Sequence, residues 1–188
     1  DGEMIKLSTR SGQFITFKEM IDELGPAVVR YFFAMRDPNA QMVFDWGLAK
    51  TTSMDNPVYY VQYAHARCCS LFRKAEEMGC PFQGMENADL TLLGHPDEQA
   101  MMRALERLPQ VIEAAARDLA PQYLTGYLQE VATLFHTFFT KGNSDASLRF
   151  IIPENLPLTQ ARLALIRCVQ IVLSNALQVL GIEPMDRM

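Results

Sequence analysis

The chain has 188 residues, of which 49% are hydrophobic and 21% charged, as in a soluble globular domain and unlike a disordered segment. Its net charge of −5 argues against a nucleic-acid binder held by a generally basic surface, so any such role must depend on local patches. No uninterrupted apolar run reaches the ~20 residues of a membrane helix, and no membrane partner is expected.

Four cysteines are present, and their spacing indicates no metal site. Cys68 and Cys69 are neighbours, while Cys80 and Cys168 lie far along the chain, so no C-x-x-C pair exists. Buried, reduced thiols are therefore expected, with no metal ligands among them. Reduced thiols are typical of an intracellular compartment, and the expected location is cytoplasmic.

The first twelve residues are polar and contain glycine, which predicts a loop. Lys6, Ser8 and Arg10 within it could bind phosphate, but the glycine spacing of a phosphate cradle is missing. Thr16 followed by Glu19 forms a capping-box pattern, which predicts a helix that begins there and ends at Gly25.

Pro26 can occupy the first turn of a second helix, which is expected to run to about residue 36. Residues 41–45 are expected to be a short extended piece, and a further helix is predicted from Asp45 to near Asn56. Trp46 is expected to be a packing anchor in this region.

Asn56 and Pro57 predict the start of a long helix that ends near Met78 and Gly79. Tyr60, Tyr63 and Arg67 stand at i, i+3 and i+7, so they share one face of it. Such a face suits stacking on exposed bases and pairing with phosphate. The same spacing is also typical of tyrosines buried in a core or an interface, so spacing alone leaves both interpretations open. A second side carries the expected core stripe, which consists of Val61, His65, Cys68 and Phe72.

Three more helical regions follow, with loops between them. One begins at Pro96 and is split at Pro109, another begins at Pro121, and the last covers about residues 156–180 before Gly181. Residues 141–145 read as a loop. Apolar stripes mark the core sides of the last two regions: Leu124, Leu128, Val131, Phe135 and Phe138, then Leu163, Ile166, Val169, Leu173, Leu177 and Leu180. The predicted fold class is an all-α helical bundle with at most one short strand.

Three stretches together resemble one known family. Residues 56–67 read Asn-Pro-Val-Tyr-Tyr-Val-Gln-Tyr-Ala-His-Ala-Arg, as in the helix that opens the anticodon-binding domain of arginyl-tRNA synthetases. Residues 161–188, which end in Glu-Pro-Met-Asp-Arg-Met, are similar to that family's closing helix and tail. Residues 6–12 resemble a degenerate KMSKS loop of a class I synthetase.

The resemblance implies a two-part organisation. Residues 1–50 would be the end of a class I catalytic domain and residues 51–188 the α-helical anticodon-binding domain. Lys6, Ser8 and Arg10 would then belong to the loop that steadies the ATP phosphates in the parent enzyme, which uses ATP and Mg²⁺ to attach arginine to its tRNA. The signature's second lysine is Thr9 here. No HIGH-like motif is present, so the chain alone is expected to be inactive and to bind no cofactor.

The resemblance also implies which residues contact RNA. The expected contacts to anticodon bases and phosphate are Tyr60, Tyr63, Arg67, Phe139 and Met188. The implied partners are the tRNA for arginine and the missing catalytic part of the same protein, in a monomer. The alternative is a helical protein-interaction module without RNA binding, which the acidic balance and the eleven methionines favour.

Overall fold

The computed structural model describes residues 15–41 and 43–188, and its regular structure is helical throughout those residues. Its α-helices are α1 (Phe17–Leu24), α2 (Pro26–Ala34), α3 (Trp46–Lys50), α4 (Pro57–Glu77), α5 (Pro96–Glu106), α6 (Leu108–Arg117), α7 (Gln122–Ser144) and α8 (Leu156–Val179). Short 3-10 turns lie at η1 (Met85–Asn87), η2 (Leu90–Leu92) and η3 (Ala146–Leu148). The all-α prediction is confirmed, and the extended piece expected at 41–45 forms no strand in its described residues.

Two of the predicted helix starts have the expected caps. Glu19 N–H donates to Thr16 Oγ1 at 3.2 Å and Thr16 N–H donates to Glu19 Oε2 at 2.7 Å, which completes the capping box of α1. Asn56 Oδ1 accepts from Val58 N at 3.1 Å at the start of α4. The Asn56 amide also donates to the Thr51 carbonyl at 2.8 Å.

The helix expected from Asp45 to near Asn56 is wrong in length, because α3 ends at Lys50. Thr51 takes an extended conformation there, and the Asn56 side chain binds the carbonyls of Ala49 and Thr51 while it caps α4. One asparagine thus joins the end of one helix to the start of the next.

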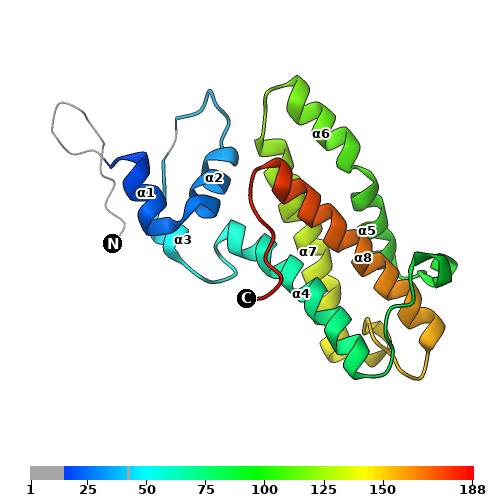
Figure 1. Ribbon diagram of the computed structural model, residues 1–188. Helices are drawn as coiled ribbons and strands as arrows, with labels where there is room; N and C mark the ends of the chain where they lie inside the picture. The colour runs from blue at the N-terminus through cyan, green and yellow to red at the C-terminus, as the bar shows by residue number, and fades with distance from the viewer. Residues whose placement is uncertain (1–14, 42) are drawn as a thin grey trace.

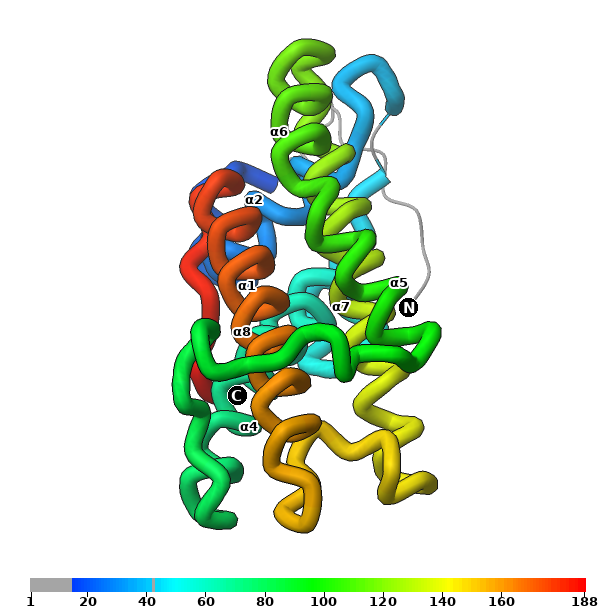
Figure 2. The backbone as a smooth tube through the Cα atoms, turned by 90° about the vertical axis from the view of Figure 1, so that its right-hand side faces the viewer, coloured from blue at the N-terminus to red at the C-terminus, as the bar shows by residue number. Residues whose placement is uncertain are grey.

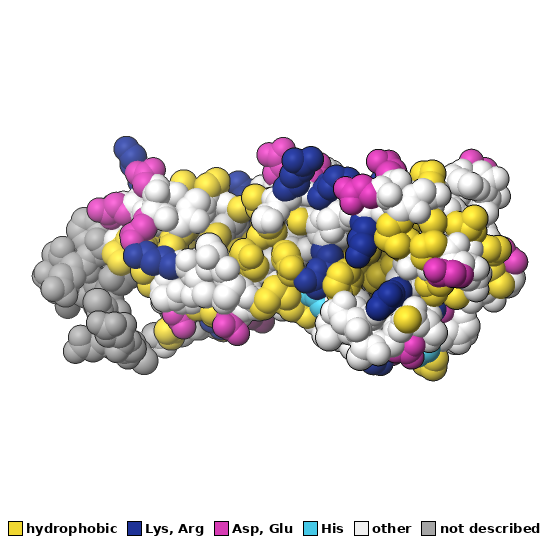
Figure 3. All heavy atoms as spheres, turned by 90° about the horizontal axis from the view of Figure 1, so that it is seen from below, with side chains coloured by type: hydrophobic (Ala, Val, Ile, Leu, Met, Phe, Trp, Pro, Cys, Tyr) yellow, Lys and Arg dark blue, Asp and Glu magenta, His cyan; other side chains and the backbone are white. Residues whose placement is uncertain are grey.

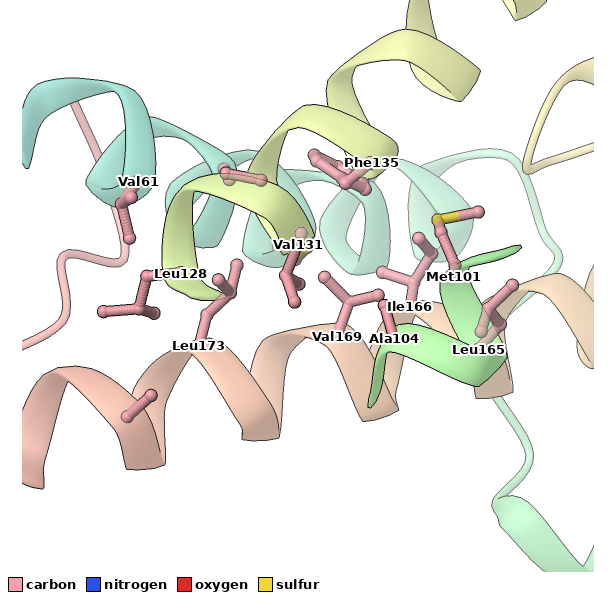
Figure 4. Packing of buried hydrophobic residues seen from close by; sticks show 14 of the residues in the cluster. Val61, Met101, Ala104, Leu128, Val131, Phe135, Leu165, Ile166, Val169 and Leu173 are labelled. Carbon is pink, nitrogen blue, oxygen red and sulfur yellow. The ribbon is translucent and has the colours of Figure 1, made fainter. Parts of the chain in front are cut away.

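A bundle of α4, α5, α7 and α8 forms the main core, with α6 continuing from α5 along α7 (Figures 1 and 2). Figure 4 shows side chains from α4, α5, α7 and α8 meeting between the helices, including Val61, Met101, Val131 and Ile166. Both predicted apolar stripes are buried, with all eleven residues at 9% exposure or less. By length and composition α8 could cross a membrane, but more than half of that window is buried here, as in a core helix.

The loop predicted at residues 141–145 is wrong, because α7 continues to Ser144. Gly142 is buried inside the helix, and a Cβ placed there would lie 3.1 Å from the carbonyl oxygen of Leu148. The glycine therefore permits close approach of the η3 segment to α7, rather than a turn.

The short helices α1–α3 form a smaller unit beside the bundle (Figure 1). Its aromatic rings pack on one another, with Trp46 in edge contact with Phe44 at 5.8 Å, in line with the packing role expected of Trp46. Tyr31 is fully buried and its hydroxyl donates to the Thr125 carbonyl at 3.2 Å, which fixes α2 on α7. Burial raises the pKa of Tyr31, so the phenol stays protonated.

One ion pair is almost completely buried in the bundle. Arg162 and Glu98 are 4% and 1% exposed, and Arg162 Nε donates to Glu98 Oε1 at 2.7 Å. Arg162 also donates to the carbonyls of Ser147 and Arg149, both at 2.7 Å, and Glu98 accepts from the His95 amide at 2.9 Å. The pair thus joins α5 and α8 and orders the segment after α7.

Replacing Arg162 with methionine should therefore cost much stability. Methionine keeps most of the length, but Glu98 is left as an uncompensated buried charge, which costs roughly 3–5 kcal/mol of the free energy of unfolding. Urea denaturation measures this loss. Arg107→Met, which breaks the exposed pair with Glu130, serves as the control and should change stability little. Equal midpoints for Arg162→Met and the parent chain would contradict the prediction.

Candidate nucleic-acid interface

At the surface between α4 and α7, an arginine lies between two aromatic rings. The guanidinium carbon of Arg67 is 4.4 Å from the centre of the Tyr63 ring and 4.1 Å from that of Phe139. Arg67 Nη2 donates to the Tyr63 hydroxyl at 2.6 Å. Because Tyr63 and Arg67 are one helical turn apart and Phe139 comes from α7, this Tyr63–Arg67–Phe139 cluster exists only when the two helices are packed.

His136 of α7 lies behind this cluster and supports it. Its Nε2–H donates to the Tyr60 carbonyl at 3.3 Å, so Nδ1 is left as an acceptor for Arg67 Nη1 at 3.4 Å. The imidazole ring also stacks on Tyr63 at 5.7 Å and meets the edge of Tyr60 at 4.7 Å. Burial, and then the charge of Arg67, lowers the pKa of His136 to about 4, so the ring is neutral near pH 7.

The two predicted tyrosines lie in different surroundings. Tyr63 is partly exposed and its ring stacks on Tyr59 at 6.0 Å, which extends the aromatic surface along α4. Tyr60 is also partly exposed, but it packs toward α7, where its hydroxyl donates to Thr133 Oγ1 at 3.3 Å. The structure therefore brings Tyr63, Arg67 and Phe139 into contact, with Tyr60 beside them through His136.

An open pocket of about 540 Å³ borders the cluster at Phe139. The second half of α4, the end of α7 and the segment 146–154 form its walls, and Lys74 and Arg149 contribute two basic side chains. Figure 3 shows basic side chains across the middle of one face of the molecule, with hydrophobic surface beside them. Apolar surface with nearby cations suits a nucleobase and its phosphate, although the chain as a whole is acidic.

The fifth predicted contact, Met188, lies on a different side of α4. The C-terminal tail runs along that helix (Figure 1), and Arg73 Nη2 donates to the carbonyl of Asp186 at 3.5 Å. The Met188 side chain is 49% exposed. It is therefore presented at the surface and is not part of the Tyr63–Arg67–Phe139 cluster.

Within the described part of the chain, one group of three side chains has the composition of a metal site: His65, Cys69 and Asp186. Hydrogen bonds account for its geometry, since Cys69 Sγ donates to Asp186 at 3.4 Å and accepts from Gln170 at 3.0 Å. His65 Nδ1 donates to the Met185 carbonyl at 2.9 Å, as expected for a hydrogen-bonded packing residue. His65 and Cys69 thus bind the C-terminal tail at Met185 and Asp186. Burial raises the pKa of the Cys69 thiol.

Lys6, Ser8 and Arg10 lie outside the described residues, so the structure gives no geometry for the expected phosphate loop. His136, in contrast, is not among the residues expected from the sequence to form the site. The sequence offered one weak signal for it, because it precedes Phe139 by three residues on the same helix.

Comparison with known proteins places the bundle in a family. The family model described as the DALR anticodon binding domain matches residues 61–188. Among curated proteins, the chain is 46% identical over 187 residues to an arginine–tRNA ligase of Geotalea daltonii and 47% identical over 188 residues to one of Thermotoga petrophila. Both matches include 100% of this chain but only 32% and 33% of those proteins. The chain therefore spans about a third of the length of these curated relatives.

Solved structures agree with this placement. The arginyl-tRNA synthetase of Thermus thermophilus superposes with a TM-score of 0.71 at 25% identity, over 96% of this chain and 29% of that one. A Campylobacter jejuni chain, provisionally named an arginyl-tRNA synthetase, gives a TM-score of 0.81 at 27% identity, over 100% of this chain and 38% of its own. The family match and these superpositions thus define the class of the fold, a helical bundle of the anticodon-binding type. The chain belongs to the DALR anticodon binding domain family.

The low pKa of His136 predicts a pH-dependent stability. The unfolded chain binds a proton on this histidine near its ordinary pKa of 6.5, whereas the folded chain resists it down to about 4. The contribution of neutral His136 to the free energy of unfolding is therefore fully present above about pH 6.5. It is lost as the pH falls from there through 4. Urea denaturation at several pH values should show this loss.

The variant His136→Phe keeps a ring at this position but cannot titrate, so this part of the pH dependence should disappear. The control His95→Asn retains a side chain able to cap α5, and it should keep the dependence. An unchanged pH profile in His136→Phe would contradict the assignment.

Proposed function

We propose that this chain is the anticodon-recognising part of an arginine–tRNA ligase, and that the parent protein uses ATP to attach arginine to its tRNA. The family match over residues 61–188 supports this, as do relatives about 46% identical over the whole chain. The observation that supports the RNA contact is the position of Arg67, whose guanidinium carbon lies 4.4 Å from the Tyr63 ring centre and 4.1 Å from that of Phe139.

The cluster is pre-organised for an unstacked base. Tyr63 already stacks on Tyr59, so its ring is fixed in orientation before RNA arrives, and less rotamer freedom is lost on binding. Two of the five N–H donors of Arg67 point to Tyr63 and His136, and the others can pair with a phosphate or a base edge. Phe139 supplies a ring without a hydroxyl, so it contributes stacking and no hydrogen bond of its own.

The proposal includes the division of the chain at residues 50 and 51. The α1–α3 unit has its own aromatic packing and meets the bundle through Tyr31, which fits the end of a separate, preceding domain. Lys6, Ser8 and Arg10 would act on ATP and Mg²⁺ only with that domain present, so the chain alone should not charge tRNA. A monomer in the cytoplasm is the simplest setting for this role.

The first test is binding of the chain to arginine tRNA and to the same tRNA with a changed anticodon, by filter retention at two salt concentrations. We expect binding to the arginine anticodon to be tighter, and salt to weaken it. Tyr63→Ala should weaken it by about 1–3 kcal/mol, the value of one lost base stack.

Tyr123→Ala is the matched control, because Tyr123 is 45% exposed and lies near the start of α7, far from Phe139. It should bind tRNA like the parent chain. Equal retention of both tRNAs by the parent chain and by Tyr63→Ala would overturn the proposed contact surface. Salt-independent capture of proteins without any tRNA binding would favour the protein-interaction alternative.

Arg67→Lys separates charge from planarity. Lysine keeps the positive charge but loses the flat guanidinium that fits between Tyr63 and Phe139. We expect tRNA binding to weaken by roughly tenfold, about 1.4 kcal/mol, while the slope of affinity against salt stays nearly the same because the charge remains. The measurement is a salt titration of both proteins. Arg117→Lys, an exposed position at the end of α6 and outside the cluster and the pocket, is the control and should bind like the parent chain. An unchanged affinity in Arg67→Lys would contradict the stacking role.

A further inference from the structure

The last residues of the chain are ordered along α4, although a polar tail is expected to fray. At the end of α8, Gly181 has a φ of +68°, and the amides of Gly181 and Ile182 donate to the carbonyls of Gln178 and Leu177 at 2.8 and 2.9 Å. Gly181 thus has the left-handed backbone conformation that commonly ends an α-helix, and the chain changes direction there. Ile182 is 1% exposed, so it anchors the start of the tail in the core.

Beyond Ile182, the side chain of Gln62 holds the backbone of the tail. Its Nε2 donates to the Glu183 carbonyl and its Oε1 accepts from the Met185 amide, both at 2.8 Å. The carbonyl oxygen and the NH₂ group of a glutamine side chain can accept and donate at the same time, as the C=O and N–H of a peptide group do. Glu183 and Met185 are two residues apart in an irregular stretch, so one amide binds both of them. Gln62 is only 4% exposed, and these are buried hydrogen bonds.

The same side of α4 continues the contact toward the end of the chain. His65 Nδ1 donates to the Met185 carbonyl at 2.9 Å, Cys69 donates to the Asp186 carboxylate, and Arg73 donates to the Asp186 carbonyl. These residues follow Gln62 at i+3, i+7 and i+11, so they form one row on the helix. Successive residues of the row contact successive residues of the tail.

This row secures the tail backbone but leaves its methionines outside. Met185 and Met188 are 46% and 49% exposed, whereas the polar groups of the tail backbone are paired with α4. If the row served only stability, apolar side chains facing the core would stabilise the tail more than buried amides do. The arrangement instead fixes the backbone at the exposed Met185 and holds the chain to within two residues of Met188.

We propose that Gln62 and His65 are positioning residues for RNA recognition, which act by fixing the tail so that Met188 is presented beside α4. They contact no RNA themselves. The ordering of the tail is completed in the free protein, so its entropic cost is not added to the binding step. The inference rests on the proposed function, and it adds Met188, the contact that the sequence resemblance implies, to the RNA-binding residues proposed there.

The first measurement needs no RNA. Hydrogen exchange at the Met185 amide reports directly on its bond to Gln62. In Gln62→Leu, which keeps the volume and removes both hydrogen bonds, that amide should exchange at least about tenfold faster, because the tail opens locally. Amides in the middle of α8 should be unchanged.

Gln160→Leu is the matched control. Gln160 is also a buried glutamine whose amide holds a loop, since it donates to the Pro81 carbonyl at 3.0 Å and accepts from the Gln83 amide at 2.9 Å. It should lose similar stability and leave Met185 exchange unchanged.

The second measurement is a double-mutant cycle in tRNA binding. Gln62→Leu and Met188→Ala should each weaken binding of arginine tRNA by about five- to tenfold. The double variant should bind no more weakly than either alone, because Gln62 acts through Met188. Gln160→Leu should bind within about twofold of the parent chain.

Three outcomes would overturn the positioning role alone. One is rapid Met185 exchange in the parent chain, and another is additive losses in the cycle. The third is normal tRNA binding by Gln62→Leu after its tail has opened, while Tyr63→Ala still binds weakly; the proposed function would then survive without the positioning role. If Tyr63→Ala and Met188→Ala both bind normally, the proposed function and this inference fail together.

Discussion

The packing of α4 against α7 and α8 fixes the rotation of α4 about its own axis, and the rest of the site depends on that rotation. Successive residues of an α-helix are rotated by about 100° about its axis. On α4 this places three groups of side chains, which face the core, α7 and the C-terminal tail, at roughly 100–145° from one another. Val61, Ala64 and Cys68 form the core side and are fully buried. With that side fixed, Tyr63 and Arg67 must face α7, and the row that begins at Gln62 must face the tail.

Buried polar side chains convert this packing into defined geometry. Hydrophobic contacts are non-directional, whereas Asn56, Gln62, His136 and Arg162 each bind backbone or side-chain partners from another part of the chain. Each would carry a large penalty if its partner moved away. They therefore specify how the loops, the tail and the neighbouring helix sit, on a core that apolar residues hold together.

The proposed RNA-binding surface between α4 and α7 is compatible with an acidic chain. Net charge governs long-range attraction, but stacking and close pairing act over a few ångströms. Arg67 is both a cation and a flat surface, and it is held by rings rather than by a carboxylate. Among the residues that the structure describes, no carboxylate forms an ion pair with it.

Local patterns in the sequence determined most of the helices. Capping residues, prolines and glycines act within a few residues, so the start of α4 at Pro57 and the end of α8 before Gly181 could be predicted. The apolar stripes of α7 and α8 followed from helical periodicity, and so did the shared face of Tyr63 and Arg67. The length of α3 and the helical course of Gly142 could not, because Asn56 and the η3 segment decide them from outside those stretches. Only the tertiary structure placed His136 behind Arg67 and the tail on Gln62, since these contacts join residues 69 to 123 positions apart, and no local rule relates them.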